Sequence, residues 1–200
     1  MHHKFKKIVV ATKNAGKLRE IKHILKEFNW EIKSLKDFPE IGEIEETGFS
    51  FYENSLIKAQ TVHDITKLPT LADDSGLCVE FLDGMPGIFS ARFSGEECDD
   101  LKNNEKLLKL MEGLPFEERK AYFKCAMVFV CDDISLGANG KLHGYIANGQ
   151  RGENGFGYDS LFYLPEYNMT TAEMASEEKN KISHRYKALI ELKRVLAEKL

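Results

Sequence analysis

The chain has 200 residues, a hydrophobic fraction of 42% and a formal net charge of −4. A chain of this length and composition buries one good core, as a single domain or as two closely joined lobes. We expect no membrane span and no signal peptide, because no stretch has the length and apolar character that either requires. The acidic balance also disfavours a general nucleic-acid binder, which normally carries a basic face.

The cysteines favour a reducing compartment. They show no Cys-x-x-Cys spacing, and two of them lie in apolar runs, so we expect reduced, buried thiols in a cytoplasm rather than disulfides or a zinc site. The cysteines are Cys78, Cys98, Cys125 and Cys131. His2 and His3 resemble the remnant of a purification tag, so they are not candidates for the site.

Hydrophobic periodicity predicts interleaved strands and helices. A strand over 8–11 is followed by apolar residues at helical spacing from Leu18 to Phe28, which leaves 12–17 as a strand-to-helix loop. The other expected elements, in chain order, are a helix over 50–63, a buried strand with a glycine-permitted turn at 73–76, a strand over 77–81, a turn over 83–87, a helix over 99–111, a strand over 121–131, its antiparallel partner over 142–147, a short strand over 161–164 and a helix over 183–200. This order predicts an α/β fold with a mixed sheet and no linker that separates domains.

The Asp-Asp-Ser-Gly stretch at 73–76 is the strongest candidate for chemistry. Carboxylates at the end of a buried strand suit Mg²⁺, which takes one or two protein carboxylates together with waters and substrate phosphates. The alternative is a solvated turn, for which this composition is common.

The segment 12–17 predicts an anion site, because N–H groups at a helix N-terminus and the positive end of its dipole attract phosphate. It is not a Walker loop, since Ala11 replaces the first glycine and Leu18 replaces the magnesium-binding hydroxyl residue. An ordinary Asn/Gly loop with a lysine that extends into solvent is the alternative.

Two further segments are candidates for binding a cation or a base. An acidic run precedes the Thr47-Gly48 turn, and we expect Glu43 to be solvated, whereas Glu45 or Glu46 is placed to share a cation with Asp74. In the glycine-rich segment 152–159, Phe156 is suited to stack against a base, although a hairpin loop with an aromatic plug has the same pattern.

The start of the last helix is unusually basic. Ser183 is a credible N-cap, which puts His184 and Arg185 in the first turn, where the helix dipole disfavours cations. Basic residues at such a position favour a ligand-facing role.

In this order the segments resemble the inosine triphosphate pyrophosphatase family of non-canonical purine nucleoside triphosphate pyrophosphatases. The resemblance runs from Ile8 to the final helix. It is carried by Thr-x-Asn-x-Gly-Lys at 12–17, Glu-Glu-Thr-Gly-x-x-Phe-x-Glu-Asn at 45–54, Ala-Asp-Asp-Ser-Gly-Leu at 72–77, Pro-Gly and Ser-Ala-Arg within 86–92, Gly-Phe-Gly-Tyr-Asp at 155–159 and Ile-Ser-His-Arg at 182–185.

The resemblance implies Mg²⁺-dependent hydrolysis of ITP, dITP and XTP to the monophosphate and pyrophosphate. It implies an elongated fold of two lobes around a long mixed sheet with flanking helices, the active site in the groove between the lobes, and a homodimer. Residues 1–200 would then form one such domain, with no nucleic acid or membrane as partner.

The resemblance also implies roles for residues at matching positions. Asp74 would be the general base and a magnesium ligand, aided by Glu45 or Glu46, and Ser75 would contact substrate. The triphosphate would lie on Thr12, Lys13, Asn14, Ala15, Gly16, Lys17 and Lys179. The base would lie on Phe156, Gly157, Tyr158, Asp159, His184 and Arg185. Lys13 stands where many members have glycine, and Ser160 where proline commonly follows the aspartate.

Selectivity is expected to come from the base-binding residues. Donors on His184 and Arg185 pair with a 6-oxo purine but are left unpaired by adenine's amino group. The alternative function is a nucleotide-sensing module that binds without turnover. Asp73 and Asp74 disfavour it, because carboxylates beside phosphates repel them unless a cation intervenes.

Overall fold

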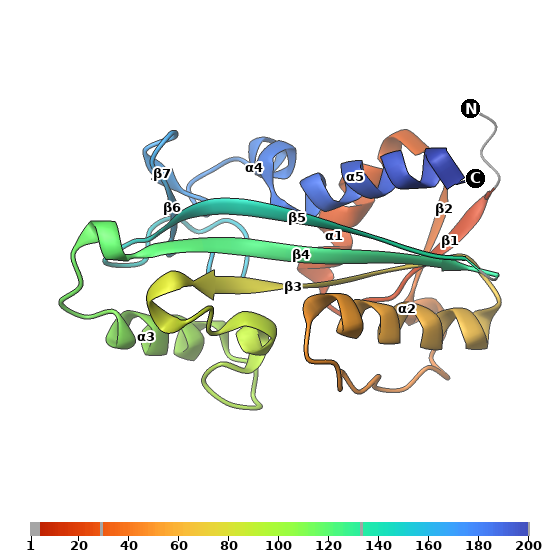
Figure 1. Ribbon diagram of the computed structural model, residues 1–200, viewed down its shortest axis with the longest axis horizontal. Helices are drawn as coiled ribbons and strands as arrows, with labels where there is room; N and C mark the ends of the chain where they lie inside the picture. The colour runs from red at the N-terminus through yellow and green to blue at the C-terminus, as the bar shows by residue number, and fades with distance from the viewer. Residues whose placement is uncertain (1–4, 29, 133, 200) are drawn as a thin grey trace. The chain divides into compact units, whose positions relative to one another are not determined.

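The computed structural model describes residues 5–28, 30–132 and 134–199. Within these residues, seven strands form one sheet in the order β2-β1-β3-β4-β5-β6-β7 (Figure 1). The strands are β1 (Lys7–Val10), β2 (Glu31–Ser34), β3 (Thr70–Val79), β4 (Lys120–Cys131), β5 (Ile134–Ile146), β6 (Phe162–Leu164) and β7 (Met169–Thr170). Strand β1 runs parallel to β2 and β3, whereas β6 runs antiparallel to β5 and β7. The predicted α/β class with a mixed sheet is therefore confirmed.

Helices α1, α2 and α3 follow residues whose side chains cap them. Asn14, Ser50 and Asp99 each accept a hydrogen bond from a backbone N–H of the first turn of the helix that follows. The α-helices are α1 (Ala15–Ile24), α2 (Phe51–Thr66), α3 (Asp100–Leu110), α4 (Ser176–Ile182) and α5 (His184–Lys199). Across the described ranges, no helix combines the length and hydropathy needed to cross a membrane.

The chain divides into two compact units, each assembled from separate segments. Unit 1 is drawn from Met1–Asp74, Cys125–Gly140 and His184–Leu200, and unit 2 from Ser75–Lys124 and Lys141–Ser183. Three of these boundaries fall inside strands β3, β4 and β5. The expectation that all 200 residues act as one domain stays a prediction.

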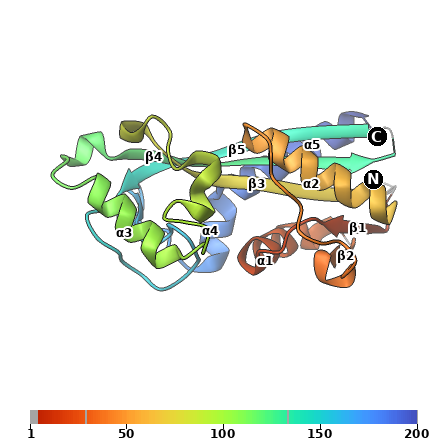
Figure 2. The same cartoon turned by 90° about the horizontal axis from the view of Figure 1, so that it is seen from below.

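In unit 1, alternate residues of each strand face different helices. Val10 and Leu71 lie in a core with residues of α1 and α5, whereas Ala11 and Ala72 lie in a core with residues of α2. Figures 1 and 2 show α2 on one side of β3, and α1 and α5 on the other. Because side chains alternate along a strand, neighbouring residues of β3 enter two different environments.

Unit 2 has its own apolar core between its part of the sheet and α3. Leu107 of α3 and Met111, which follows the helix, are fully buried there, together with Leu77 of β3 and Phe162 of β6. Burial of side chains of this size contributes about 1.5–3 kcal/mol each. This core fixes α3 against the strands that precede and follow it.

The predicted turn at 73–76 is wrong. Strand β3 continues without interruption through Val79, and Gly76 is not in a left-handed conformation. Its lack of a side chain serves a close approach instead, since a Cβ there would lie 2.3 Å from Ser90 Oγ and 2.4 Å from the Gly87 carbonyl oxygen. The Asp-Asp-Ser-Gly stretch is therefore strand interior, and Asp73 and Asp74 are both buried.

Other boundaries also differ from expectation. Helix α1 begins at Ala15, so Ala15, Gly16 and Lys17 are helical rather than loop residues, and the strand predicted over 77–81 is the end of β3 followed by a 3₁₀ turn at Glu80–Leu82. Strand β5 starts at Ile134, well before the predicted 142–147. The cysteines are free, and Cys78, Cys125 and Cys131 are buried as predicted, whereas Cys98 is exposed. Tag-like residues His2 and His3 lie outside the described residues.

Candidate active site

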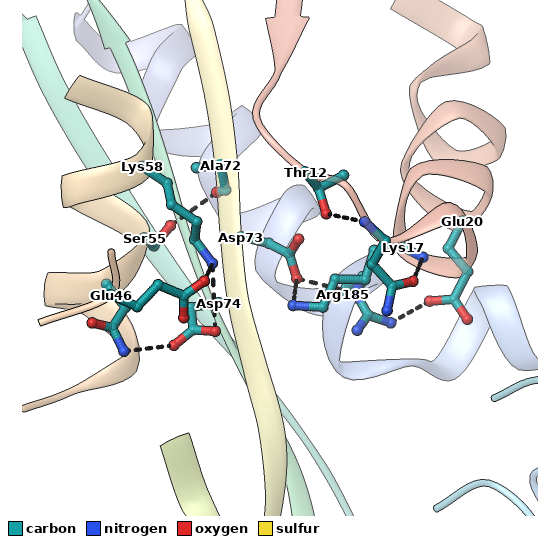
Figure 3. Close-up of polar contacts among 12 residues, drawn as sticks. Thr12, Lys17, Glu20, Glu46, Ser55, Lys58, Ala72, Asp73, Asp74 and Arg185 are labelled. Carbon is teal, nitrogen blue, oxygen red and sulfur yellow. Dashed lines mark hydrogen bonds and ion pairs between the residues drawn. The ribbon is translucent and has the colours of Figure 1, made fainter. Parts of the chain in front are cut away.

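Strand β3 directs two adjacent carboxylates to opposite sides of the sheet in unit 1. Figure 3 shows Asp73 pointing toward Lys17 and Arg185, and Asp74 pointing toward Lys58 and Glu46. This is the period-two alternation of side chains along a strand. We call the surroundings of Asp73 the α1/α5 side and the surroundings of Asp74 the α2 side.

On the α1/α5 side, Asp73 is held by cations. Its Oδ2 lies 3.2 Å from Lys17 Nζ and accepts a hydrogen bond from Arg185 Nε at 3.2 Å, and its side chain has no exposed surface. Burial alone would raise the pKa of Asp73, but Lys17, Arg185 and the more distant Lys58 outweigh it and hold the pKa well below its ordinary value. Asp73 therefore stays ionised and is a poor proton acceptor.

Arg185 links this carboxylate to a second one. Its Nη1 donates to Glu20 of α1, and its side chain is almost fully buried. The guanidinium is thus shared between Asp73 and Glu20, which explains how a cation is accommodated at the start of α5. The neighbouring His184 is also buried, at 4% exposed.

On the α2 side, Asp74 has a weaker set of partners. Asn54 Nδ2 donates to Asp74 Oδ2 at 3.2 Å, and Lys58 Nζ lies 3.6 Å from Oδ1. Lys58 lies closer to Glu46, to which Nζ donates at 2.9 Å. Asn54 and Lys58 are four residues apart on α2, so one helix face delivers both partners.

The pKa of Asp74 is displaced in the opposite direction from that of Asp73. Burial raises it, and the negative charges of Glu46 and Asp73 add to the rise, while Lys58 and Lys17 oppose it without cancelling it. Burial also opposes the charge on Lys58, yet Asp74, Asp73 and Glu46 raise the pKa of its ammonium. Asp74 is therefore the more basic of the two adjacent carboxylates.

Glu46 is the acidic-run residue that approaches Asp74. It is half-buried and shares Lys58 with Asp74, whereas Glu45 and Glu43 are exposed. Asn54 Oδ1 accepts the N–H of Gly48 at 2.8 Å, which fixes the turn that follows Glu46. Of Glu45 and Glu46, the two candidates from the sequence, Glu46 is the residue that lies near Lys58 and Asp74.

The carboxylates of Glu46 and Asp74 suit a hard cation that keeps part of its hydration shell. Glu46 and Asp74 converge on one ammonium, so their oxygens already surround a positive charge. Residues 5–28, 30–132 and 134–199 contain no cluster of three or more metal-ligating side chains. Mg²⁺ bound by one or two carboxylates, waters and substrate phosphates matches such a donor set.

The predicted anion loop leads from β1 into α1. Asn14 Oδ1 accepts the Lys17 N–H at 3.0 Å, and Thr12 Oγ1 accepts the Asn14 N–H at 3.2 Å. Lys13, Asn14 and Ala15 are exposed. The loop thus offers an accessible helix N-terminus.

The remaining predicted residues lie in unit 2. Asp159 is buried, its Oδ2 accepts from Lys179 Nζ at 2.6 Å and from the Phe156 N–H at 2.9 Å, and its Oδ1 accepts from Thr171 Oγ1 at 2.8 Å. The Lys179 ammonium also lies 5.3 Å from the centroid of the Phe156 ring. Within unit 2, Lys179 thus accompanies the predicted base-binding segment. Ser75 is half-buried in β3.

Sequence reasoning missed Glu20 and Lys58, and it gave no role to Asn54, the last residue of the motif at 45–54. Helical spacing could have indicated them, because Glu20 follows Lys17 by three residues and Lys58 follows Asn54 by four. What could not be read from the sequence is that α1 and α2 present these residues to opposite sides of the same strand.

Comparison with known proteins identifies the family of this chain. The sequence model of the Ham1 family matches residues 8–195. The chain belongs to the Ham1 family. A relative from Listeria monocytogenes, named dITP/XTP pyrophosphatase, is 50% identical over 193 residues, which are 96% of this chain and 95% of the relative. A Bacillus cereus protein of the same name is 47% identical over 196 residues, or 96% of each chain.

A solved Ham1 structure has the same fold. The Staphylococcus aureus Ham1 protein superposes with a TM-score of 0.86 at 37% identity and covers 98% of this chain and 100% of its own. The predicted family resemblance is therefore confirmed, and the mixed-sheet α/β fold is that of the Ham1 family.

Proposed function

We propose that this protein hydrolyses non-canonical purine nucleoside triphosphates, namely dITP, XTP and ITP, to the nucleoside monophosphate and pyrophosphate. Its Ham1 relatives are named dITP/XTP pyrophosphatases. The observation that carries the proposal is the convergence of Asp74 and Glu46 on one buried cation, with the pKa of Asp74 raised by burial. A displaced carboxylate pKa of this kind is typical of a general base.

Asp74 and Glu46 would hold Mg²⁺. When bound, that ion neutralises phosphate charge and lowers the pKa of a coordinated water. Lys58 contacts both carboxylates and limits their mutual repulsion, and its charge opposes the rise in the pKa of Asp74.

Asp74 would accept a proton from the attacking water as the bond between the α- and β-phosphates breaks and pyrophosphate leaves. Its raised pKa makes it a better acceptor than Asp73, which two cations hold in the ionised form. Residues 12–17 and Lys179 would bind the phosphates, with Ser75 also in contact with the substrate. Charge stabilisation of this kind is the main contribution that proteins make to phosphoryl transfer.

Residues 156–159 with His184 and Arg185 would bind the base, with Phe156 stacked on the purine ring. Donors that pair with a 6-oxo group are left unsatisfied by adenine, and sites of this type discriminate by about 10⁴–10⁵-fold. In unit 1 the Arg185 donors already pair with Asp73 and Glu20, so this role requires a donor beyond those contacts or a rearrangement of them.

We further propose a cytoplasmic homodimer that binds neither nucleic acid nor membrane. The support is the family resemblance, the acidic charge of −4 and the reduced cysteines. Sedimentation equilibrium tests the oligomeric state, and a species of monomer mass at micromolar concentration would exclude the dimer.

A nucleotide panel tests the function. The protein is incubated with Mg²⁺ and dITP, XTP, ITP, ATP or GTP, and the products are separated, with the Asp74→Asn variant as a control. The proposal expects monophosphate and pyrophosphate from the first three nucleotides and little from ATP or GTP. Orthophosphate as the product, equal rates on ATP, or binding without turnover would contradict it, and the last result would favour a nucleotide sensor.

A further inference from the structure

One face of α3 carries polar side chains where an apolar face would be expected. Asn103 and Asn104 follow Asp100 by three and four residues, the spacing of neighbours on a helix surface. Asn103 and Asn104 are 1% and 3% exposed. Buried amides require hydrogen-bond partners, so these residues contact something specific.

Two of these residues hold the same glycine. Asp100 Oδ2 accepts the N–H of Gly157 at 2.7 Å, and Asn104 Nδ2 donates to the Gly157 carbonyl oxygen at 3.0 Å. Both backbone polar groups of Gly157 are therefore bound by one helix of the same unit. Gly157 has a φ of +62°, a left-handed conformation in which glycine is the least strained residue.

Further contacts also fix the segment 155–159. Asp159 Oδ2 accepts the Phe156 N–H, and a Cβ on Gly155 would lie 2.1 Å from that same oxygen. The Tyr158 hydroxyl donates to the Ser90 carbonyl oxygen at 2.8 Å. Residues 155–159 are thus held by α3, by Ser90 and by a hydrogen bond within the segment.

Asn104 is retained at a cost in stability. Its Oδ1 is buried and accepts no hydrogen bond from any residue in the described parts of the chain. A buried polar atom without a partner costs about 1–3 kcal/mol, which a leucine of similar volume would avoid. Its contact with Gly157 is the one benefit that an apolar residue could not supply.

We propose that Asp100 and Asn104 are positioning residues, which fix Gly157 so that residues 155–159 are already shaped to receive the purine base before substrate arrives. This inference rests on the proposed function, in which Phe156 stacks on the base. Neither side chain needs to touch the substrate. A loop that is ordered in advance loses less conformational entropy on binding, so the benefit appears as affinity.

Steady-state kinetics on dITP test the proposal in four variants. Asp100→Ala removes the charged acceptor and should raise KM about 10-fold, since such hydrogen bonds are worth about 1.5–3 kcal/mol. Asn104→Leu should raise KM about 2–10-fold, in line with about 0.5–1.5 kcal/mol for a neutral hydrogen bond. In both, kcat should change less than twofold. Asp100→Asn keeps an acceptor oxygen and should restore most of the affinity.

The matched control is Lys102→Ala, which lies on the same helix but pairs with exposed Glu97. It should leave KM and kcat unchanged. Amide exchange gives a second readout, because the Gly157 N–H loses its acceptor in Asp100→Ala and should exchange faster than in the wild type. Asn104→Leu should unfold at the same denaturant concentration as the wild type, or a higher one.

Opposite results would overturn the inference. The inference fails if KM is unchanged in Asn104→Leu, or if kcat falls by as large a factor as KM rises. It also fails if Asp100→Asn is as impaired as Asp100→Ala. Each of these results would mean that α3 has only a structural role. These outcomes are separable from failure of the proposed function, since absence of pyrophosphate with the wild-type protein and dITP would contradict that function first.

Discussion

The two sides of β3 place an aspartate carboxylate in different electrostatic surroundings. On the α1/α5 side, Asp73 is enclosed by Lys17 and Arg185 and its pKa lies well below the ordinary value. On the α2 side, Asp74 lies beside Lys58, which it shares with Glu46, and its pKa is raised. Burial is similar on both sides, so the balance of neighbouring charges determines which carboxylate anchors the structure and which is available for chemistry.

The largest expected effect is on turnover by Asp74→Asn. The change keeps the size of the side chain but removes a proton acceptor and a metal-ligand charge. Loss of a general base alone costs about 10²–10⁴-fold in rate, and loss of the metal site adds to that. The measurement is kcat on dITP at saturating Mg²⁺, and a loss below tenfold would remove Asp74 from the chemistry.

Next in size is the loss of stability in Asp73→Asn. The change leaves Lys17 and Arg185 facing a neutral amide in the interior, and removal of one partner of a buried ion pair costs about 3–5 kcal/mol. Denaturant unfolding of the metal-free protein near pH 7 measures it. Asp74→Asn is the control and should be at least as stable as the wild type, because the folded state disfavours the charge on Asp74.

Asp73 and Asp74 are expected to affect the pH dependence of stability in opposite directions. The stabilisation from Asp73 is complete above its unfolded pKa of about 3.9 and is lost as pH falls through its lower folded value. The contribution of Asp74 is present below about pH 3.9 and is lost as pH rises through its higher folded value. The stability deficit of Asp73→Asn relative to the wild type should therefore shrink in acid. The stability of Asp74→Asn relative to the wild type should increase as pH rises. Parallel curves would disprove the asymmetry.

A smaller effect is expected on selectivity in Arg185→Ala. If Arg185 reads the 6-oxo group, the ratio of kcat/KM for ITP to that for ATP should narrow at least about 10-fold, since hydrogen bonds to charged groups are worth about 1.5–3 kcal/mol. The ion pairs to Asp73 and Glu20 supply the competing explanation. An equal loss on both nucleotides, in a variant that still folds, would make Arg185 an anchor for these carboxylates or a phosphate ligand.

The smallest expected effect is a change in the pKa of Asp74 itself. Lys58 lowers this pKa and Glu46 raises it, so Lys58→Met should move it up and Glu46→Gln should move it down. Carboxyl-detected NMR titration of the metal-free variants measures both. Shifts of the same sign would mean that neither charge acts directly on Asp74.

The sequence was sufficient for most of the fold because its strands and longer helices are strongly periodic. It failed at β2 and α4, where Glu31–Ser34 and Ser176–Ile182 are short and polar and carry no apolar period. It also failed at 73–76, where glycine was interpreted as a turn residue. The glycine is required by the approach of Ser90 and Gly87, which lie 14 and 11 residues further along the chain, and no local pattern encodes that contact.

The candidate site was predictable as a set of motifs but not as a set of contacts. Asp73, Asp74 and Lys17 were identified from local spacing, and the opposite directions of the two aspartates follow from strand geometry alone. The partners Glu20 and Lys58 depend on how α1 and α2 pack on β3. Asp100 and Asn104 were not identified because their significance lies in contact with Gly157, more than 50 residues away.

Direct titration of Asp73 and Asp74 in the metal-free wild-type protein tests the central claim most directly. Carboxyl-detected NMR, with each resonance assigned from the corresponding asparagine variant, would follow both groups through the acid range. The account predicts that Asp73 titrates below the ordinary aspartate value of about 3.9 and Asp74 above it. A common midpoint, or the reverse order, would contradict it.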